Sequence, residues 1–281
     1  MILKSLLVRL SIWWRFTINC FRTENRLVTM GASLSKVAAK LMKSVENSKR
    51  SEILFEHIDT LLPHIFNLYY ASISYHKTVQ TISVSGFGLN GWLVIRSQLE
   101  ALLIFLYLTE PFDDLEEIED RTLRYRDWTI VKMYQNSKKS SGMDILNSLS
   151  THVNFEKKIN DNFKYIQEEY KDKQDELKIL KNSSSFLRNK AKIADNHGFK
   201  DLYNHVQAEC SASLHIADSS DRMKVSGNEK GTKYSFGVNL HDGLWSMLLS
   251  NLLFLELLKN FSLFFGIKDV FHKRISTITK F

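Results

Sequence analysis

Apolar residues recur every three or four positions along most of the chain, a pattern that is typical of amphipathic helices. Between positions 33 and 75 the repeating residues are Val37, Leu41, Val45, Ile53, Ile58, Leu61, Ile65 and Leu68. Residues 92–108, WLVIRSQLEALLIFLYL, are apolar on almost every side and predict a central buried helix. Further helices are expected after Pro111, over about 200–217 and over 244–265. The pattern therefore predicts an all-α fold, a multi-helix bundle around one buried helix.

A long polar helical arm is expected between the polar loop at Ser140 and the residues Asn182–Ser185. Residues 143–181 combine many charges with a narrow apolar stripe that includes Leu149, Phe163, Ile166, Tyr170 and Leu177. So narrow a stripe is typical of a projecting helix that binds a partner or a second copy of the chain. The Gly- and Lys-rich segment Ser226–Lys233 is expected to be a loop.

Composition supports the helical prediction and limits the chemistry. The 281 residues include only two prolines and eleven glycines, too few for the many turns of an all-β fold. Two cysteines, Cys20 and Cys210, exclude a disulfide framework and a zinc ribbon. We therefore expect a cytoplasmic protein without a metal or another cofactor.

The net charge of +7 comes from the first part of the chain. Residues 1–50 contain ten Lys or Arg against two Asp or Glu, whereas the remainder is close to neutral. Residues 1–29 form a basic amphipathic leader ahead of a single helical domain at 30–281. Two interpretations remain open: the leader is an interfacial helix that binds the inner membrane surface, or it is extra translated sequence before a native start at Met30.

Two charged residues stand out on the predicted central helix. Arg96 and Glu100 lie four positions apart, so their side chains meet on one face. A buried pair seldom stabilises a fold more than apolar residues would. It either fixes the helix register, or it serves a site in which Arg96 binds phosphate or carboxylate and Glu100 orients it.

The other candidates lie on the helix expected over 200–217. Its small residues include Ser211, beside which His215 would point into a crevice as a general acid or base. A backbone-bonded His215 is the structural alternative. Tyr203 and Ser211, together with Arg124 of the helix after Pro111, are the candidate substrate-binding residues. A solvated helix face explains Asp201, His205 and Glu209 better than a metal site does.

These motifs, taken in order, resemble a known family. The elements are R-S-x-L-E on the buried helix (Arg96 to Glu100), the stretch RNKAKIADNHG at 188–198, and Tyr203, Ser211 and His215 in the spacing Y-x(7)-S-x-x-x-H. Together they resemble the bacterial helical proteins grouped as domain of unknown function 5677, over roughly residues 50–265. The resemblance implies an all-helical fold and candidate positions, and it implies no reaction.

A looser similarity is to the HEPN superfamily, helical bundles that include RNases of toxin and anti-phage systems. Their mark is an Arg and a His on one helix, a spacing that Arg50 and His57 meet. Three functions follow as expectations. The first is a non-enzymatic module that binds a protein partner or a second copy through the arm. The second is a ribonuclease or phosphate-handling enzyme that uses Arg96, Glu100 and His215 on RNA in toxin or phage defence. The third is a membrane-surface protein tethered by residues 1–29.

Overall fold

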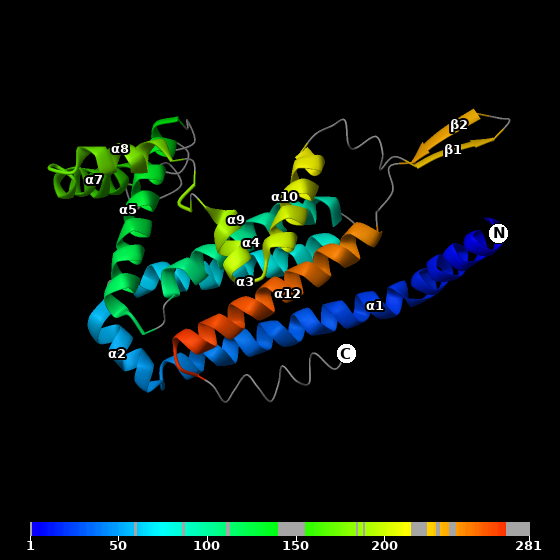
Figure 1. The fold of residues 1–281 in the computed structure, drawn as a ribbon, viewed down its shortest axis with the longest axis horizontal. Coiled ribbons are helices and arrows are strands. Elements are labelled where there is room, and N and C mark those ends of the chain that lie inside the picture. Colours follow the sequence, from blue (N-terminus) through cyan, green and yellow to red (C-terminus); the bar gives the residue numbers. More distant parts are fainter. Residues whose placement is uncertain are drawn as a thin grey trace.

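The computed structural model describes residues 2–58, 61–85, 88–110, 113–139, 155–183, 185–187, 189–214, 224–228, 231–235 and 240–267. Of residues 2–22 and of the two strands, only the backbone is described. Helices dominate this part of the chain, which confirms the all-α prediction (Figure 1). The one exception is a small hairpin, in which β1 (Lys224–Asn228) pairs antiparallel with β2 (Gly231–Ser235). It occupies the segment that was expected to be a loop.

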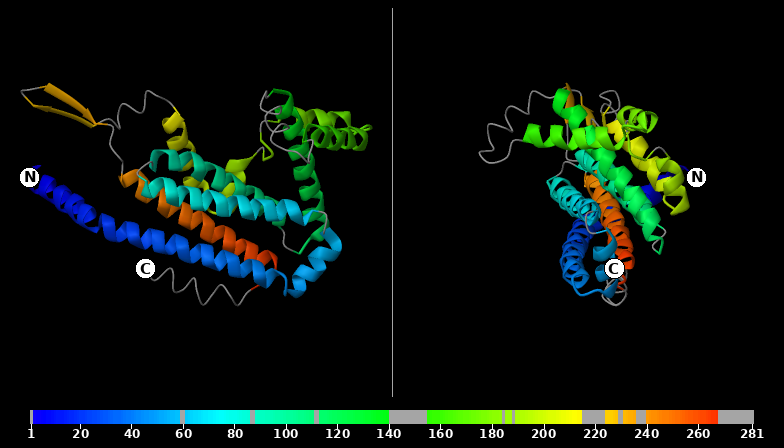
Figure 2. Two further views of the ribbon diagram at one scale, coloured as in Figure 1. Left: turned by 180° about the vertical axis from the view of Figure 1, so that it is seen from behind. Right: turned by 90° about the vertical axis from the view of Figure 1, so that its left-hand side faces the viewer.

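Four helices that lie side by side form the body of the protein (Figures 1 and 2). They are α1 (Ile2–Val45), α3 (Leu62–Val84), α4 (Gly88–Thr109) and α12 (Leu240–Phe264). The predicted central helix is confirmed, because α4 contributes buried residues from Trp92 to Leu108 and packs on both α3 and α12. Two stretches, Asn90–Thr109 and Gly243–Phe264, are apolar and long enough to cross a membrane, but 61% of each is buried within the fold.

The short helix α2 (Lys49–Ile58) closes one end of the body. Ser48 Oγ donates to the carbonyl of Phe265, and Arg50 Nε donates to that of Phe264 at 2.7 Å. Both bonds satisfy carbonyls that the end of α12 leaves without helical partners. Gly266 then stops α12 at φ +66°, with the backbone N–H of Ile267 reaching back to Ser262. Arg50, the Arg of the HEPN-like spacing, thus caps a helix, and the side chain of His57 lies outside the described residues.

A buried polar layer crosses the body at His76 on α3. Its side chain is fully buried, with Nδ1 3.1 Å from Ser250 Oγ and Nε2 3.4 Å from the Gly31 carbonyl. Ser250 Oγ in turn donates to Gln98 Oε1 at 2.8 Å, and the Phe254 ring stacks on the imidazole at 4.4 Å. Burial lowers the pKa of His76 to about 4, against weaker opposing hydrogen bonds. The layer therefore joins α1, α3, α4 and α12 around a neutral imidazole.

The arm differs from the prediction in its shape. Helix α5 (Leu115–Lys139) leaves the body, and two helices, α7 (Phe155–Glu169) and α8 (Gln174–Asn182), pack against its far end (Figure 1). A turn at 170–173 breaks the single helix expected over 143–181. The apolar stripe is covered by α5, because it forms a second small core with Val131. Leu149 lies outside the described residues.

Helices α9 (Lys190–Asn196) and α10 (Lys200–Leu214) cover the outer face of α4. The link between them is Gly198 at φ +73°, where the N–H of Phe199 donates back to the Ala194 carbonyl at 2.6 Å. This geometry is the Schellman end of a helix, and it turns the chain sharply from α9 into α10. The fold thereby places α9 between the body and the arm.

Candidate functional site

A cleft of about 910 Å³ lies between the body and the arm. Its walls are the carboxyl end of α4, the inner face of α5, the turn between α7 and α8, and α9. Its volume lies in the range of pockets that bind small molecules or side chains of a partner. We define this cleft, lined from Tyr107 to His197, as the candidate functional site.

An aromatic cluster lies at the base of the cleft. Phe186 packs edge-on against Tyr107 and Tyr125, with ring centroids 5.7 and 5.0 Å apart, and it lies 5.9 Å from Trp128. The indole N–H of Trp128 donates to Ser183 Oγ at 2.9 Å. Aromatic contacts of this kind fix ring positions beyond what burial alone achieves. The cleft therefore has a rigid apolar base.

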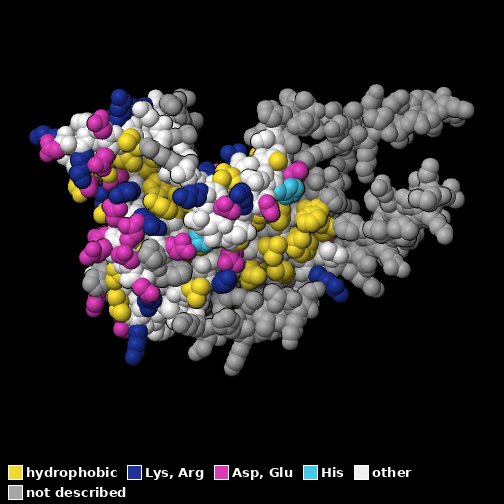
Figure 3. Space-filling model, viewed as in Figure 1, with side chains coloured by type: hydrophobic (Ala, Val, Ile, Leu, Met, Phe, Trp, Pro, Cys, Tyr) yellow, Lys and Arg dark blue, Asp and Glu magenta, His cyan; other side chains and the backbone are white. Residues whose placement is uncertain are grey.

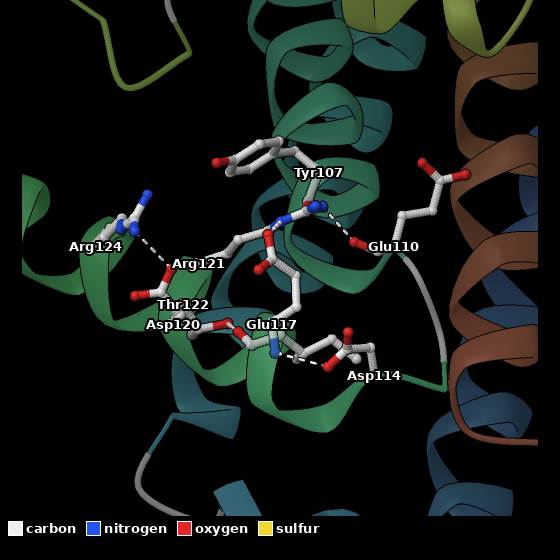
Figure 4. A network of polar contacts seen from close by, with 9 residues as sticks. Tyr107, Glu110, Asp114, Glu117, Asp120, Arg121, Thr122 and Arg124 are labelled. Atoms are coloured by element: carbon white, nitrogen blue, oxygen red, sulfur yellow. Dashed lines mark hydrogen bonds and ion pairs between the residues drawn. The ribbon is translucent and has the colours of Figure 1, made fainter.

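Arg121 joins the two helices that meet at one wall (Figure 4). Its guanidinium bonds Glu117 Oε1 at 2.6 Å and the Tyr107 carbonyl at 2.7 Å, and it also donates to the Glu110 carbonyl. These carbonyls lie at the negative end of the α4 dipole, where a cation is favoured. Asp114 Oδ1 accepts from the Glu117 N–H at 3.0 Å and caps the start of α5. Arg121 is thus a structural residue of the wall.

Arg124, one of the predicted substrate-binding residues, lies on the cleft one turn further along α5. Its Nη2 is 2.8 Å from Asp120 Oδ2, and the side chains are 61% and 49% exposed. An ion pair so exposed contributes little to stability and exchanges partners readily. Arg124 is therefore free to turn toward an anionic group that enters the cleft.

A buried carboxylate of α5 holds the end of α7. The Asp127 side chain is 2% exposed and accepts from Tyr170 Oη and from Arg126 Nε, each at 2.8 Å. Arg126 also binds Glu169 of α7 at 3.1 Å. Burial, followed by the hydrogen bond to Asp127, raises the pKa of Tyr170 well above its ordinary value. Tyr170 therefore stays a protonated donor and holds the end of α7 on α5.

The opposite wall, α9, is held on α4 by a polar contact near each end. Lys190 Nζ lies 2.7 Å from Glu100 Oε1, and His197 Nε2 lies 3.2 Å from Glu110 Oε2. Between them Ile193 packs on the main core. The two contacts make α9 run along the carboxyl half of α4, and its outer side presents Lys192 to the cleft.

The predicted pair of Arg96 and Glu100 is formed but is not buried. Arg96 Nε lies 3.6 Å from Glu100 Oε1, and their side chains are 39% and 31% exposed. The expectation of burial was wrong because α4 turns its other sides to α3 and α12, so that this face receives only the short helices α9 and α10. Long charged side chains keep their ends in water at such an edge. Glu100 is shared with Lys190, which the sequence did not indicate.

Among the described residues, neither Tyr203 nor Ser211 makes an ion pair or a side-chain hydrogen bond with this pair. Tyr203 is half-buried against the main core, and Ser211 is exposed on the outer side of α10. His215 lies outside the described residues. On the inner side, Cys210 is buried and donates to the Trp92 carbonyl at 2.9 Å, and burial raises its pKa to about 11. A thiol with so high a pKa is unreactive.

Sequence reasoning missed the cleft itself. Its residues come from helices that are far apart in the chain, and Arg124 alone among them was predicted to be a site residue. The signals that existed were local ones, such as Glu117 and Arg121 at helical spacing. Among the described residues, no group of three His, Cys, Asp or Glu side chains is arranged to hold a metal ion.

Comparison with known proteins identifies the family of the chain. The model of DUF5677, described as a family of unknown function, matches residues 64–231. No curated protein and no solved structure matches the chain. The matched segment is more than half of the chain and includes every residue that lines the cleft. The chain therefore belongs to DUF5677, a family of unknown function.

Proposed function

We propose that this protein is a non-enzymatic interaction module that binds a segment of a partner protein in the cleft between body and arm. The observation that supports this most is the composition of the cleft, which has an aromatic base and a rim with charges of both signs. A peptide offers apolar side chains, charges and backbone polar groups together, and so it matches such a lining better than a purely anionic or purely apolar ligand does.

The state of the ionisable groups favours binding over catalysis. Several charged side chains of the cleft are already paired: Arg121 with Glu117, and both Asp127 and Glu169 with Arg126. A general acid or base must lie within hydrogen-bond reach of the proton that it transfers, and each of these pairs holds its groups on one another. Paired groups instead give a fixed surface, to which a partner docks with little rearrangement.

The arm supplies an exposed apolar residue at the rim. Ile179 of α8 lines the cleft and is 46% exposed. Met133 of α5 is 51% exposed but does not line the cleft. The two residues therefore form a matched pair, one inside and one outside the proposed binding surface.

The experiment compares capture of partner proteins by three purified baits: wild type, Ile179→Asp and Met133→Asp. We expect one protein from the native host to bind wild type and Met133→Asp at equal levels and to be lost with Ile179→Asp. All three baits should melt at similar temperatures, because both side chains are largely exposed. Equal capture by Ile179→Asp and wild type would contradict binding in the cleft.

The competing function is a ribonuclease or phosphate-handling enzyme that uses Arg96, Glu100 and His215. Arg96 lies 11 residues before Tyr107 on α4, about 16 Å along the helix from the cleft. The enzyme would therefore act at a different place from the cleft. Growth arrest and RNA cleavage on expression of wild type, abolished in well-folded Arg96→Ala and His215→Ala, would replace the proposed module with an enzyme.

A further inference from the structure

The two ends of the molecule differ in the character of their surface. On the face drawn in Figure 3, Lys, Arg, Asp and Glu are dense at the arm end with apolar side chains among them, and a further group of apolar side chains, with few charges beside it, lies over α12 below α10. Among the apolar residues that the structure exposes are Trp245 and Leu252 of α12, at 44% and 45%, and Leu93 of α4, at 37%. Trp245 and Leu252 are seven residues apart and so lie on one face of α12.

Helix α1 runs past the start of α12 at this same end (Figures 1 and 2). Among its described side chains, the first that is buried is Leu27, which packs with Leu244 and Met247 of α12. The backbone of residues 2–22 continues the helix for about 32 Å beyond that region. The chain thus extends a long helix from the apolar end of the body.

The sequence of that extension combines apolar and basic residues. Positions 2–22 hold Lys4, Arg9, Arg15 and Arg22, and no Asp or Glu occurs before Glu24. Most other positions are apolar and include the adjacent Trp13 and Trp14. Basic residues and tryptophans on an apolar helix are typical of segments that lie in the headgroup region of a bilayer.

We propose that this end of the molecule binds the surface of an anionic lipid bilayer. Residues 2–22 of α1 supply the positive charge, and the exposed face of α12 with Leu252 supplies an apolar contact. The cleft and the arm, at the other end of the long axis, then point away from the lipid. The proposal is independent of the function proposed for the cleft, since it involves none of the residues that line it.

The positive charge of residues 2–22 favours lipid over a second copy of the chain as the binding partner of this end. Two copies that met through this end would bring together two helices of charge +4, which repel each other. An anionic bilayer attracts the same charges, and each basic residue near its surface strengthens binding about fivefold. The attraction weakens when salt shortens the Debye length.

The test is sedimentation of the full-length protein with vesicles of phosphatidylcholine, either pure or with roughly one-third phosphatidylglycerol. We expect wild type to pellet with the anionic vesicles at about 0.1 M salt and to be released at about 0.5 M. Arg9→Glu combined with Arg15→Glu should weaken binding at least about 30-fold. Lys36→Glu with Lys40→Glu is the matched control, because both lysines are exposed on the part of α1 that lies against the body.

A second pair of variants tests the apolar contact. Leu252→Asp should reduce pelleting, whereas Ile53→Asp, on α2 and 48% exposed, should not. The cleft variant Ile179→Asp should bind vesicles like wild type, which separates this proposal from the function of the cleft. Equal pelleting of wild type and the Arg9, Arg15 variant would overturn the proposal. A second outcome would also overturn it: wild type binds no vesicles and forms a dimer in sedimentation equilibrium, and Leu252→Asp dissociates that dimer. A second copy of the chain would then cover this face.

Discussion

Protonation of His76 should destabilise the protein, because its imidazole lies in the polar layer and no carboxylate of the described residues is beside it. Ser250, Gly31 and the Phe254 ring surround it, and the charged neighbour that acts on it is Lys77. Burial is the main cause of its lowered pKa, and the positive charge of Lys77 lowers it further. We therefore expect the replacement of His76 by Gln to change how stability depends on pH.

The magnitude follows from the two pKa values of His76. In the unfolded chain the ordinary value of 6.5 applies, and in the folded protein the pKa is about 4. Below pH 6.5 the unfolded state therefore binds a proton that the folded state does not. Stability that is present above pH 6.5 is lost as the pH falls, by about 2.5 kcal/mol at pH 4.5 and about 3 kcal/mol below pH 4.

The assay is urea unfolding of wild type and His76→Gln at several pH values between about 7.5 and 4.5. Carboxylates titrate alike in both proteins, so the difference between the two curves isolates His76. Over this pH range the free energy of unfolding of wild type should fall by about 2.5 kcal/mol more than that of the variant. Parallel curves would refute the reasoning. An NMR titration of wild type gives a second measure, in which the His76 ring should stay neutral at pH 5.

Substitutions at four further positions test the geometry of the site by urea unfolding. Arg121→Ala should lower the free energy of unfolding by about 2 kcal/mol, because two carbonyls at the end of α4 lose a charged donor. Arg121→Lys should restore part of this stability. Asp127→Asn should cost about 2 kcal/mol and loosen the arm, which protease cleavage after α7 would report; an unchanged rate would contradict its role. Gly198→Ala should cost about 1 kcal/mol through its positive φ alone, because the added methyl group meets no atom within 4 Å. Arg124→Ala should change stability by less than about 0.5 kcal/mol yet weaken partner binding; a large loss of stability would show that its exposed pair with Asp120 is structural.

The helices of the body could be predicted from sequence because their signal is local. The apolar run of α4 and the repeats of α12 require burial wherever they occur, and the acidic residues before Arg121 mark the start of α5. The predicted bounds of α12 differ from the observed ones by a few residues, and capping contacts from distant residues such as Arg50 explain where it ends.

What could not be predicted depends on contacts between distant segments. No Gly or Pro marks the turn at 170–173, which forms because the apolar residues on both sides of it pack on α5. The exposure of Arg96 depends on which face of α4 receives the short helices α9 and α10, and the sequence of α4 alone does not contain this information. The buried position of His76 could not be predicted either, because its hydrogen-bond partners lie 45 and 174 positions away in the sequence.

The most direct test of the cleft as a binding surface is photo-crosslinking in the native host. A benzophenone amino acid replaces Ile179 at the rim in one strain and Met133 outside the cleft in another. The proposed function predicts one discrete adduct with a partner protein at position 179 that is absent at position 133. Identical patterns at the two positions, or no adduct at position 179, would contradict it.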